Sequence, residues 1–407
     1  MKLSAYACAV LLLLGPLRGQ AEEVPDPTQA LYREALQSIA EGRKSDASEA
    51  LARVIDMEPL HAGAWLELAL IQCSLGHAAE AERLFRAIEQ RFAPPPGILE
   101  LINNTRAQGC SNWQPHSTSA LTLGRGIDQN VNQGASTGSY LIGLPGSQIE
   151  LPLSTDFLPK HDQYSALSGE YLRDLTPNGT LGFVQAQVRR NDNLRQYDSA
   201  SLFTGLETPW QFGRWALRGT AMMGWISLGN QYYQRQTQLQ ARLGPPLPWP
   251  LGVQFHLMAG LSKVDYLTLD HFNTHSGELR GQFNYRNEHG SGSLSYGVVD
   301  ERAHALRPGG DRHGDQLHLN WRQQLSAELS ADFGFSRQHW RSASAYAPGL
   351  IDQVRAQRTD TLRAAFSYPL SKTQSLQLEL RQTRNQENIS IFQYNSRQLQ
   401  LNWQWQN

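Results

Sequence analysis

The chain has 407 residues, a formal net charge of −1 and a sequence pI near 6.9. This length allows two or three domains, and the balanced charge gives no sign of the clustered basic excess that marks a nucleic-acid-binding protein. We therefore predict no nucleic-acid partner.

The first 21 residues have the pattern of an export signal. Lys2 precedes the apolar run Ala5–Leu14, and the small residues Gly19 and Ala21 stand where a signal peptidase requires them. The run stops at Gly15, well short of the roughly 18 apolar residues of a membrane anchor. We predict a cleaved signal peptide over 1–21.

Residues 28–92 are rich in Ala, Leu, Glu and Arg, with apolar residues at helical spacing. A shift of 34 residues superposes small and apolar positions of one half on those of the other, and this is the tetratricopeptide period. The predicted signature residues are Gly42, Ala47, Pro59, Trp65, Gly76, Ala81 and Phe85. After three prolines, Gly97–Arg106 is predicted as a short capping helix.

These elements predict a tetratricopeptide-like helical domain over 22–112 that binds a protein on its concave face. The alternative is a scaffold that binds no ligand. Cys73 and Cys110 remain after signal cleavage, and an oxidising compartment permits a disulfide between them. Two buried free thiols are the other interpretation.

From about residue 113 the chain alternates with period two, which is typical of strands with one apolar and one polar face. We predict about 14 strands, an even number as in outer-membrane barrels. They lie near 118–129, 164–175, 180–190, 198–207, 213–226, 232–243, 251–263, 274–286, 291–299, 315–324, 327–339, 357–369, 374–384 and 395–405.

Short turns and longer links alternate along these strands, the longer ones including 130–163, 300–314 and 340–356. That order, without any long apolar helix, predicts a transmembrane antiparallel β-barrel over 113–407, and hence an α + β multidomain chain. The short turns are expected on the periplasmic side with the helical domain. In the last strand, Leu399, Leu401, Trp403 and Trp405 are expected to face lipid.

The faces opposite the apolar residues carry charges of both signs, as expected for a watery lumen. The candidate lumen-lining residues are Arg218, Glu278, Arg280, His318, Arg322, Asp332, Arg363, Glu379 and Arg381.

The short motifs that match catalytic or metal-binding patterns lie in the wrong structural context. Gly134–Gly138 has the spelling of a nucleophile elbow but lies in a Gly/Ser-rich loop, whereas the motif needs a strand before it and a helix after it. His271 and His275 have zinc spacing only if they lie on a helix. We predict no enzyme, no cofactor and no metal; a lumenal Ser/His site assembled by folding stays open.

The order of these landmarks resembles the surface lipoprotein assembly modifier (Slam) family and its tetratricopeptide-plus-barrel relatives in Gram-negative bacteria. The resemblance is carried by Gly126–Asn132 (GIDQNVN) on the first strand and by Thr383–Tyr394 before the last strand. It implies a 14-strand barrel that helps client proteins cross the outer membrane. It also assigns Asp128, Asn130 and Asn132 to the family motif, with a structural role at the rim.

The resulting hypothesis is an outer-membrane translocation barrel whose helical module meets its client in the periplasm. The implied partners are an unidentified exported client protein, outer-membrane lipid and the barrel-assembly machinery. Two alternatives remain: an exopolysaccharide-export porin, and a passive porin with a helical periplasmic module.

Overall fold

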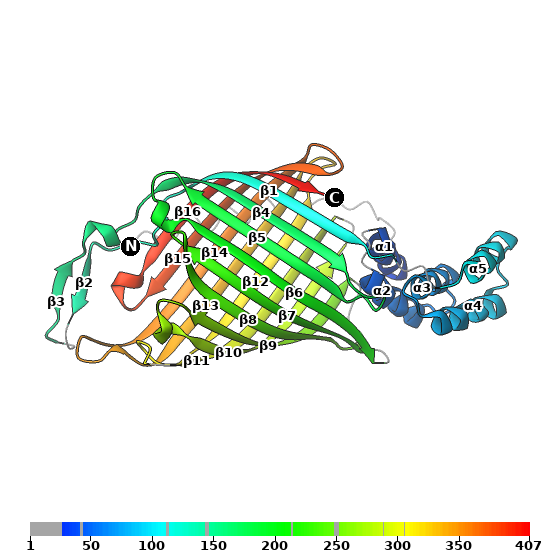
Figure 1. The fold of residues 1–407 in the computed structure, drawn as a ribbon, viewed down its shortest axis with the longest axis horizontal. Coiled ribbons are helices and arrows are strands. Elements are labelled where there is room, and N and C mark those ends of the chain that lie inside the picture. The colour runs from blue at the N-terminus through cyan, green and yellow to red at the C-terminus, as the bar shows by residue number, and fades with distance from the viewer. Residues whose placement is uncertain are drawn as a thin grey trace, which may run out of the picture.

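The computed structural model describes residues 27–40, 44–110, 114–142, 146–212, 215–247, 252–287, 289–304 and 306–407. Five helices precede a closed barrel in these ranges, and Figure 1 shows the two parts in sequence along one long axis. The predicted signal peptide over 1–21 and the signature residue Gly42 lie outside the described residues.

The helical part is built from two helix pairs and one further helix. Its elements are α1 (Pro27–Ala40), α2 (Lys44–Met57), α3 (Ala62–Ser74), α4 (Ala78–Phe92) and α5 (Pro96–Gln108). A proline near the start of α5 suits the first helical turn, where the missing N–H has no intrahelical partner. Gly76 follows α3 with φ 79°, a conformation that glycine adopts without steric cost.

The core of this module follows the predicted repeat positions. Ala47 and Ala81 are completely buried, and Phe85 is 1% exposed. Small residues at the two equivalent positions let the helices approach closely while the larger side chains fill the space between them. Trp65 packs in the same cluster and donates its indole N–H to the carbonyl of Pro59 at 3.1 Å. The helix pairs and their core are therefore present; the tetratricopeptide assignment itself stays a prediction.

Fourteen antiparallel strands form the closed barrel, as predicted. They are β1 (Ser117–Asp128), β4 (Asp162–Asp174), β5 (Leu181–Asn191), β6 (Ser199–Phe212), β7 (Trp215–Leu228), β8 (Gln231–Gly244), β9 (Val253–Tyr266), β10 (Thr274–Arg286), β11 (Gly290–Ala303), β12 (Arg312–Gln324), β13 (Ser330–Ala347), β14 (Ile351–Pro369), β15 (Gln374–Glu387) and β16 (Tyr394–Gln406). The first and last strands close the sheet, with Ala120 opposite Gln406 and Asp128 opposite Gln398.

The barrel has two different rims. The chain enters β1 from the helices at one rim, which we call the helix-side rim; the turns after β4, β6, β8, β10, β12 and β14 also lie there. The opposite, loop-side rim carries the 129–161 connection. This connection contains a small hairpin of β2 (Ser139–Ile142) and β3 (Ile149–Pro152), which the sequence pattern did not predict.

Two connections on the loop-side rim are instructive. β7 and β8 are joined by Gly229 and Asn230, both with positive φ, which is the two-residue hairpin geometry that matches strand twist. The predicted long link over 340–356 is wrong: β13 runs to Ala347 and β14 begins at Ile351. Residues 341–345 of β13 (RSASA) are all small or polar, so the apolar alternation that marks a strand in lipid is absent from them.

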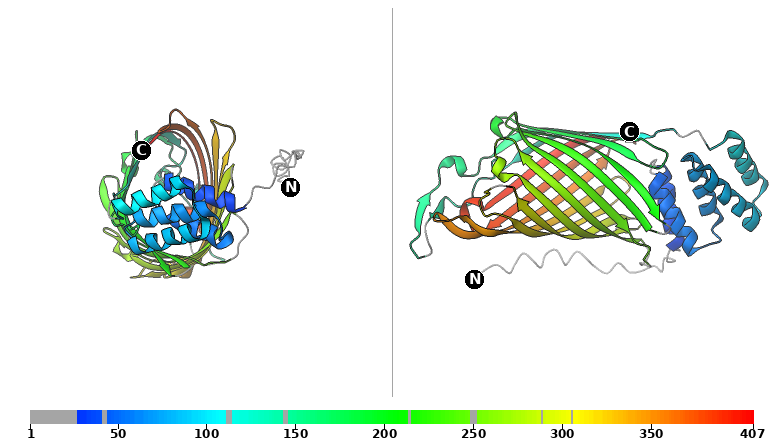
Figure 2. Two further views of the ribbon diagram at one scale, coloured as in Figure 1. Left: turned by 90° about the vertical axis from the view of Figure 1, so that its right-hand side faces the viewer. Right: turned by 60° about the horizontal axis from the view of Figure 1, so that its bottom comes forward.

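The helical module lies across the helix-side rim of the barrel (Figure 2). Helices α1 and α2 are nearest to the strands, and α4 and α5 extend away from them (Figure 1). This arrangement places the first helix pair at one mouth of the lumen.

Candidate functional site

The outward face of the barrel is apolar on every strand. One exposed apolar residue of each strand defines what we call the outer apolar band: Leu123, Leu167, Val184, Leu202, Met223, Leu239, Leu261, Leu279, Leu294, Leu319, Phe333, Leu362, Leu378 and Leu401. The register sets such residues side by side, for example Leu239 opposite Leu261 and Leu378 opposite Leu401. A continuous apolar surface of this kind around a closed sheet is the lipid-facing surface of a membrane barrel.

The chain forms an outer-membrane β-barrel. In the described parts of the helical module, no helix is both long enough and apolar enough to cross a bilayer. Across the described ranges, no group of three or more His, Cys, Asp or Glu side chains could hold a metal ion.

All nine candidate lumen residues lie on strand faces opposite the outer apolar band. Most of them pair with a charge of opposite sign on the same or the adjacent strand. Arg280 Nε donates to Glu278 at 2.7 Å, and Arg322 Nε donates to Asp332 at 2.7 Å. Glu379 accepts from both Arg363 and Arg381, each at 2.9 Å, and His318 contacts Gln316. The paired charges keep the lumen polar without giving these strands a field of one sign.

The helical module contacts lumen-facing residues at its mouth. Asp46 of α2 forms an ion pair with Arg218 of β7, and Arg218 Nη1 also donates to Glu207 at 3.0 Å. Glu34 of α1 accepts from Gln254 Nε2 at 3.3 Å and lies 4.0 Å from the guanidinium of Arg286. Arg218, Gln254 and Arg286 share the inward face of their strands, so the first helix pair interacts with the inside of the lumen as well as its edge.

The predicted family motif is at the other rim, where it joins the two ends of the sheet. Asp128 is 3% exposed and accepts hydrogen bonds from Arg189 Nη2 at 2.9 Å, Ser396 Oγ at 2.8 Å and Gln398 Nε2 at 2.8 Å. It also accepts from the backbone N–H of Asn130 at 2.9 Å. A buried carboxylate with these four donors is satisfied, and it ties β1 to both β5 and β16.

The two asparagines of the motif hold the long connection in place. Asn130 donates from Nδ2 to the carbonyls of Gly134 and Asn395, both at 2.9 Å. Asn132 donates to the carbonyl of Leu158 at 2.8 Å and accepts from the N–H of Lys160 at 2.9 Å. Their contacts fix the loop over 129–161 against the last hairpin, and they use the amide groups for structure rather than for chemistry.

A cavity of about 240 Å³ lies in the lumen wall near the loop-side rim. Its lining includes the aromatic residues Tyr266, Phe272, Trp340 and Tyr346 and the cations Arg307, Arg312 and Arg355. Glu301 pairs with Arg307 and accepts from Arg312 Nε at 2.7 Å, and the Arg312 guanidinium lies 4.4 Å from the centre of the Trp340 ring. Aromatic faces and planar cations together suit sugar rings or an extended peptide.

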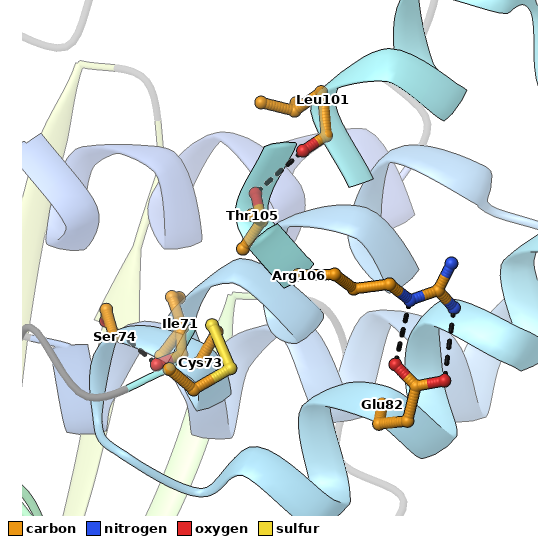
Figure 3. Close-up of a disulfide and its surroundings, with 8 residues drawn as sticks. Ile71, Cys73, Ser74, Glu82, Leu101, Thr105 and Arg106 are labelled. Atoms are coloured by element: carbon orange, nitrogen blue, oxygen red, sulfur yellow. Dashed lines mark hydrogen bonds and ion pairs between the residues drawn. A yellow bond between two sulfur atoms is a disulfide. The ribbon is translucent and has the colours of Figure 1, made fainter. Parts of the chain in front are cut away.

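Helix α5 is fixed to the rest of the module by a covalent bond and by an ion-pair cluster (Figure 3). Cys73 at the end of α3 is bonded to Cys110 just after α5. Arg106 donates to Glu82 at 2.8 Å and to Glu89 at 2.6 Å, both on α4. Hydrogen bonds from Arg106 and then Arg86 hold the pKa of the Glu82 carboxyl below its ordinary value.

Comparisons with known proteins give weak likenesses only. No family model and no curated protein matches the chain. An anion-selective porin from Comamonas acidovorans is 8% identical, over 72% of this chain and 99% of that one, with a TM-score of 0.39. The outer membrane channel DcaP of Acinetobacter baumannii is 8% identical, over 72% and 97%, with a TM-score of 0.42. An outer membrane channel from Pseudomonas putida F1 is 11% identical, over 72% and 95%, with a TM-score of 0.37.

Likenesses at this level transfer no activity to this chain. The membrane assignment rests instead on its own closed sheet and on the outer apolar band.

Several residues of the two mouths were missed by sequence reasoning. Asp46 and Glu34 resemble ordinary solvated helix residues, and Arg189 resembles any other residue of a polar strand face. A charged residue on a helix gives no sequence signal for the strand that it will meet. Only the fold brings Asp46 to Arg218, or Arg189 to Asp128.

Proposed function

We propose that this chain assists the passage of client proteins across the outer membrane, with its helical module receiving the client on the periplasmic side. The observation that carries the proposal is the contact of α1 and α2 with inward-facing residues of the mouth, through Glu34 and Asp46. A passive porin with a helical periplasmic module would have the same contacts, and passage of a client is what distinguishes the proposal from it. A module at that position is suited to pass a chain into the lumen.

The same arrangement supports an orientation in which the helix-side rim faces the periplasm. The helices join the rim with the shorter turns, and short turns lie on the periplasmic side of outer-membrane barrels. The family resemblance to Slam proteins points the same way. The proposed client is a surface lipoprotein or a soluble secreted protein.

The lumen wall is consistent with a polypeptide as cargo. Its charges are neutralised in pairs such as Arg322 with Asp332, and the wall of β16 presents Gln398, Gln400 and Gln404. Amide side chains can donate to and accept from a passing peptide backbone without selecting one charge. A single-sign lumen would instead select ions or a charged polymer.

Export of a polysaccharide is the second candidate, because one observation favours it. The cavity with Trp340, Tyr346 and Arg312 offers ring stacking and cationic hydrogen-bond donors, which are suited to an acidic sugar. It lies at the loop-side rim, where an exported polymer would leave the barrel.

The deciding experiment compares a deletion strain with the same strain complemented by the wild-type gene. Protease shaving with quantitative proteomics reports surface proteins, and staining of the same cells reports surface polysaccharide. Loss of one or a few surface proteins with unchanged polysaccharide supports the proposal. Loss of polysaccharide alone supports the second candidate, and an unchanged surface in both assays contradicts both.

A further inference from the structure

A group of arginines lies on the outward face of β13–β16, directly beyond the outer apolar band on the loop side. We call Arg337, Arg358, Asp360, Arg384 and Arg397 the outer arginine patch. Asp360 stands opposite Arg337 on one side and opposite Arg384 on the other. Each of these residues lies on the same face of its strand as the lipid-facing apolar residues, as Asp360 and Leu362 do on β14.

The patch has a clear excess of positive charge. Asp360 accepts from Arg337 Nε at 2.7 Å and from Arg358 Nε at 3.0 Å, so one carboxylate serves two guanidinium groups. Four arginines against one aspartate leave about three positive charges at neutral pH, because arginine does not lose its proton in proteins.

Arg384 and Arg397 are exposed and have no ion-pair or hydrogen-bond partner for their side chains among the described residues. Arg384 stands opposite Asn395, and Arg397 opposite Gln382, so the two arginines are diagonal neighbours on adjacent strands. Diagonal neighbours are about 7–8 Å apart at the backbone, within reach of long side chains. Two like charges at that spacing repel each other unless an anion lies between them.

Their position determines which anion can reach them. Leu380 and Leu399, on the same strand faces, are exposed toward the hydrocarbon layer. The patch therefore lies where the acyl chains end and the headgroups begin. A ligand there must combine apolar chains with a strongly anionic head.

We propose that the outer arginine patch binds a lipid with phosphomonoester groups, the acyl chains of which lie along Leu362, Leu380 and Leu399. Planar guanidinium groups bind phosphate oxygens in pairs, and each phosphomonoester carries about −1.5 to −2 charges. Two such groups match the excess charge of the patch. A phosphodiester headgroup, with a single charge, does not.

The test uses the full-length protein in detergent micelles and native mass spectrometry. The probes are diphosphorylated lipid A, phosphatidylglycerol and phosphatidylcholine, each titrated separately. The double variant R384Q/R397Q removes the two unpartnered arginines. The control R173Q/R190Q removes two exposed outward-facing arginines of β4 and β5, which lie outside the patch. Heat-modifiable gel migration establishes that each variant is a folded barrel.

We expect the wild type and the control to bind lipid A at least about tenfold more tightly than phosphatidylcholine, since the arginines of the intact patch make charge-assisted hydrogen bonds to phosphate. R384Q/R397Q should lose most of that preference, and R384K/R397K should retain part of it. Equal binding of lipid A by R384Q/R397Q and the wild type overturns the proposal. Tighter binding of phosphatidylglycerol than of lipid A also overturns it.

Discussion

Asp46 of helix α2 is paired with Arg218, a lumen-facing residue at the start of strand β7. The side chain of Arg218 is 14% exposed and that of Asp46 is 30% exposed. The pair therefore links the helical module, which is proposed to receive the client, to the lumen through which the client is proposed to pass.

Breaking this pair should loosen the module at the mouth. D46N leaves the hydrogen bond from Arg218 to Glu207 in place, so we expect a loss of only about 1 kcal/mol of docking free energy. Adding E34Q removes the second contact with the lumen. The double variant should raise the frequency of high-conductance states in planar bilayers, because α1 and α2 leave the mouth more often.

E49Q is the matched control for that experiment, because Glu49 lies on the same helix and forms its ion pair with Arg53 of that helix. It should leave the conductance unchanged. Equal conductance of the wild type and D46N/E34Q would show that the module does not restrict the mouth.

Neutralising Asp128 should destabilise the loop-side rim. D128N removes the charge that Arg189 pairs with, and a half-satisfied buried pair costs about 3–5 kcal/mol. We expect a lower heat-modification temperature on gels and faster hydrogen exchange over 129–161. D156N, which changes an exposed aspartate of the same loop that pairs with Lys160, should have little effect. If D128N has the heat-modification temperature and hydrogen exchange of the wild type, Asp128 does not stabilise the loop-side rim.

The disulfide should stabilise the helical module without affecting the barrel. Cys73 and Cys110 are 37 residues apart in sequence, and a cross-link across a loop of that size contributes about 4 kcal/mol. C73S/C110S should increase hydrogen exchange in α3 and α5 while the strand peptides stay protected. Exchange that rises equally in the strands would contradict this separation of the two parts.

The contact of α5 with α4 should weaken in acid. Since Arg106 and Arg86 lower the pKa of Glu82 from 4.5, Glu82 stabilises the folded module above pH 4.5 and loses this effect as the pH falls through its lowered pKa. The contribution is below about 1 kcal/mol because the groups are partly exposed. Hydrogen exchange over 96–108, corrected for the intrinsic rate, should rise below pH 4.5.

R106Q should remove most of that pH dependence. E80Q is the control, because Glu80 pairs with Arg83 on its own helix and cannot hold α5. If hydrogen exchange over 96–108 in R106Q still rises in acid, the contact of Arg106 with Glu82 is not the origin of the pH dependence.

Sequence patterning predicted the parts of the fold that lipid and close packing impose. Alternate residues such as Leu399 and Leu401 must be apolar on a lipid-facing strand, and small residues such as Ala47 and Ala81 must stand where helices cross. Both constraints produce a periodic pattern in the sequence. The hairpin over 340–356 lies beyond the outer apolar band and has no such constraint, so its sequence predicts a loop where the structure has two strands.

The contacts that matter for function are less visible in the sequence. Asn130 donates to Asn395, 265 residues away, and Asp46 meets Arg218 across a domain junction. Single polar residues carry no period, so their partners follow from the closure of the barrel and the docking of the module. The motif around Asp128 could be recognised only through the family resemblance.

The most direct test of the central claim is site-specific photocrosslinking in intact cells. One probe replaces Leu60, an exposed residue between α2 and α3, and a second replaces Gln240 on the inward face of β8. A third probe at Leu239, the next residue, faces lipid and serves as the control. If a client passes through the lumen, the same exported polypeptide crosslinks at positions 60 and 240 but not at 239. Crosslinking of no polypeptide at 240, or of the same species equally at 239, would contradict passage of a client through this lumen.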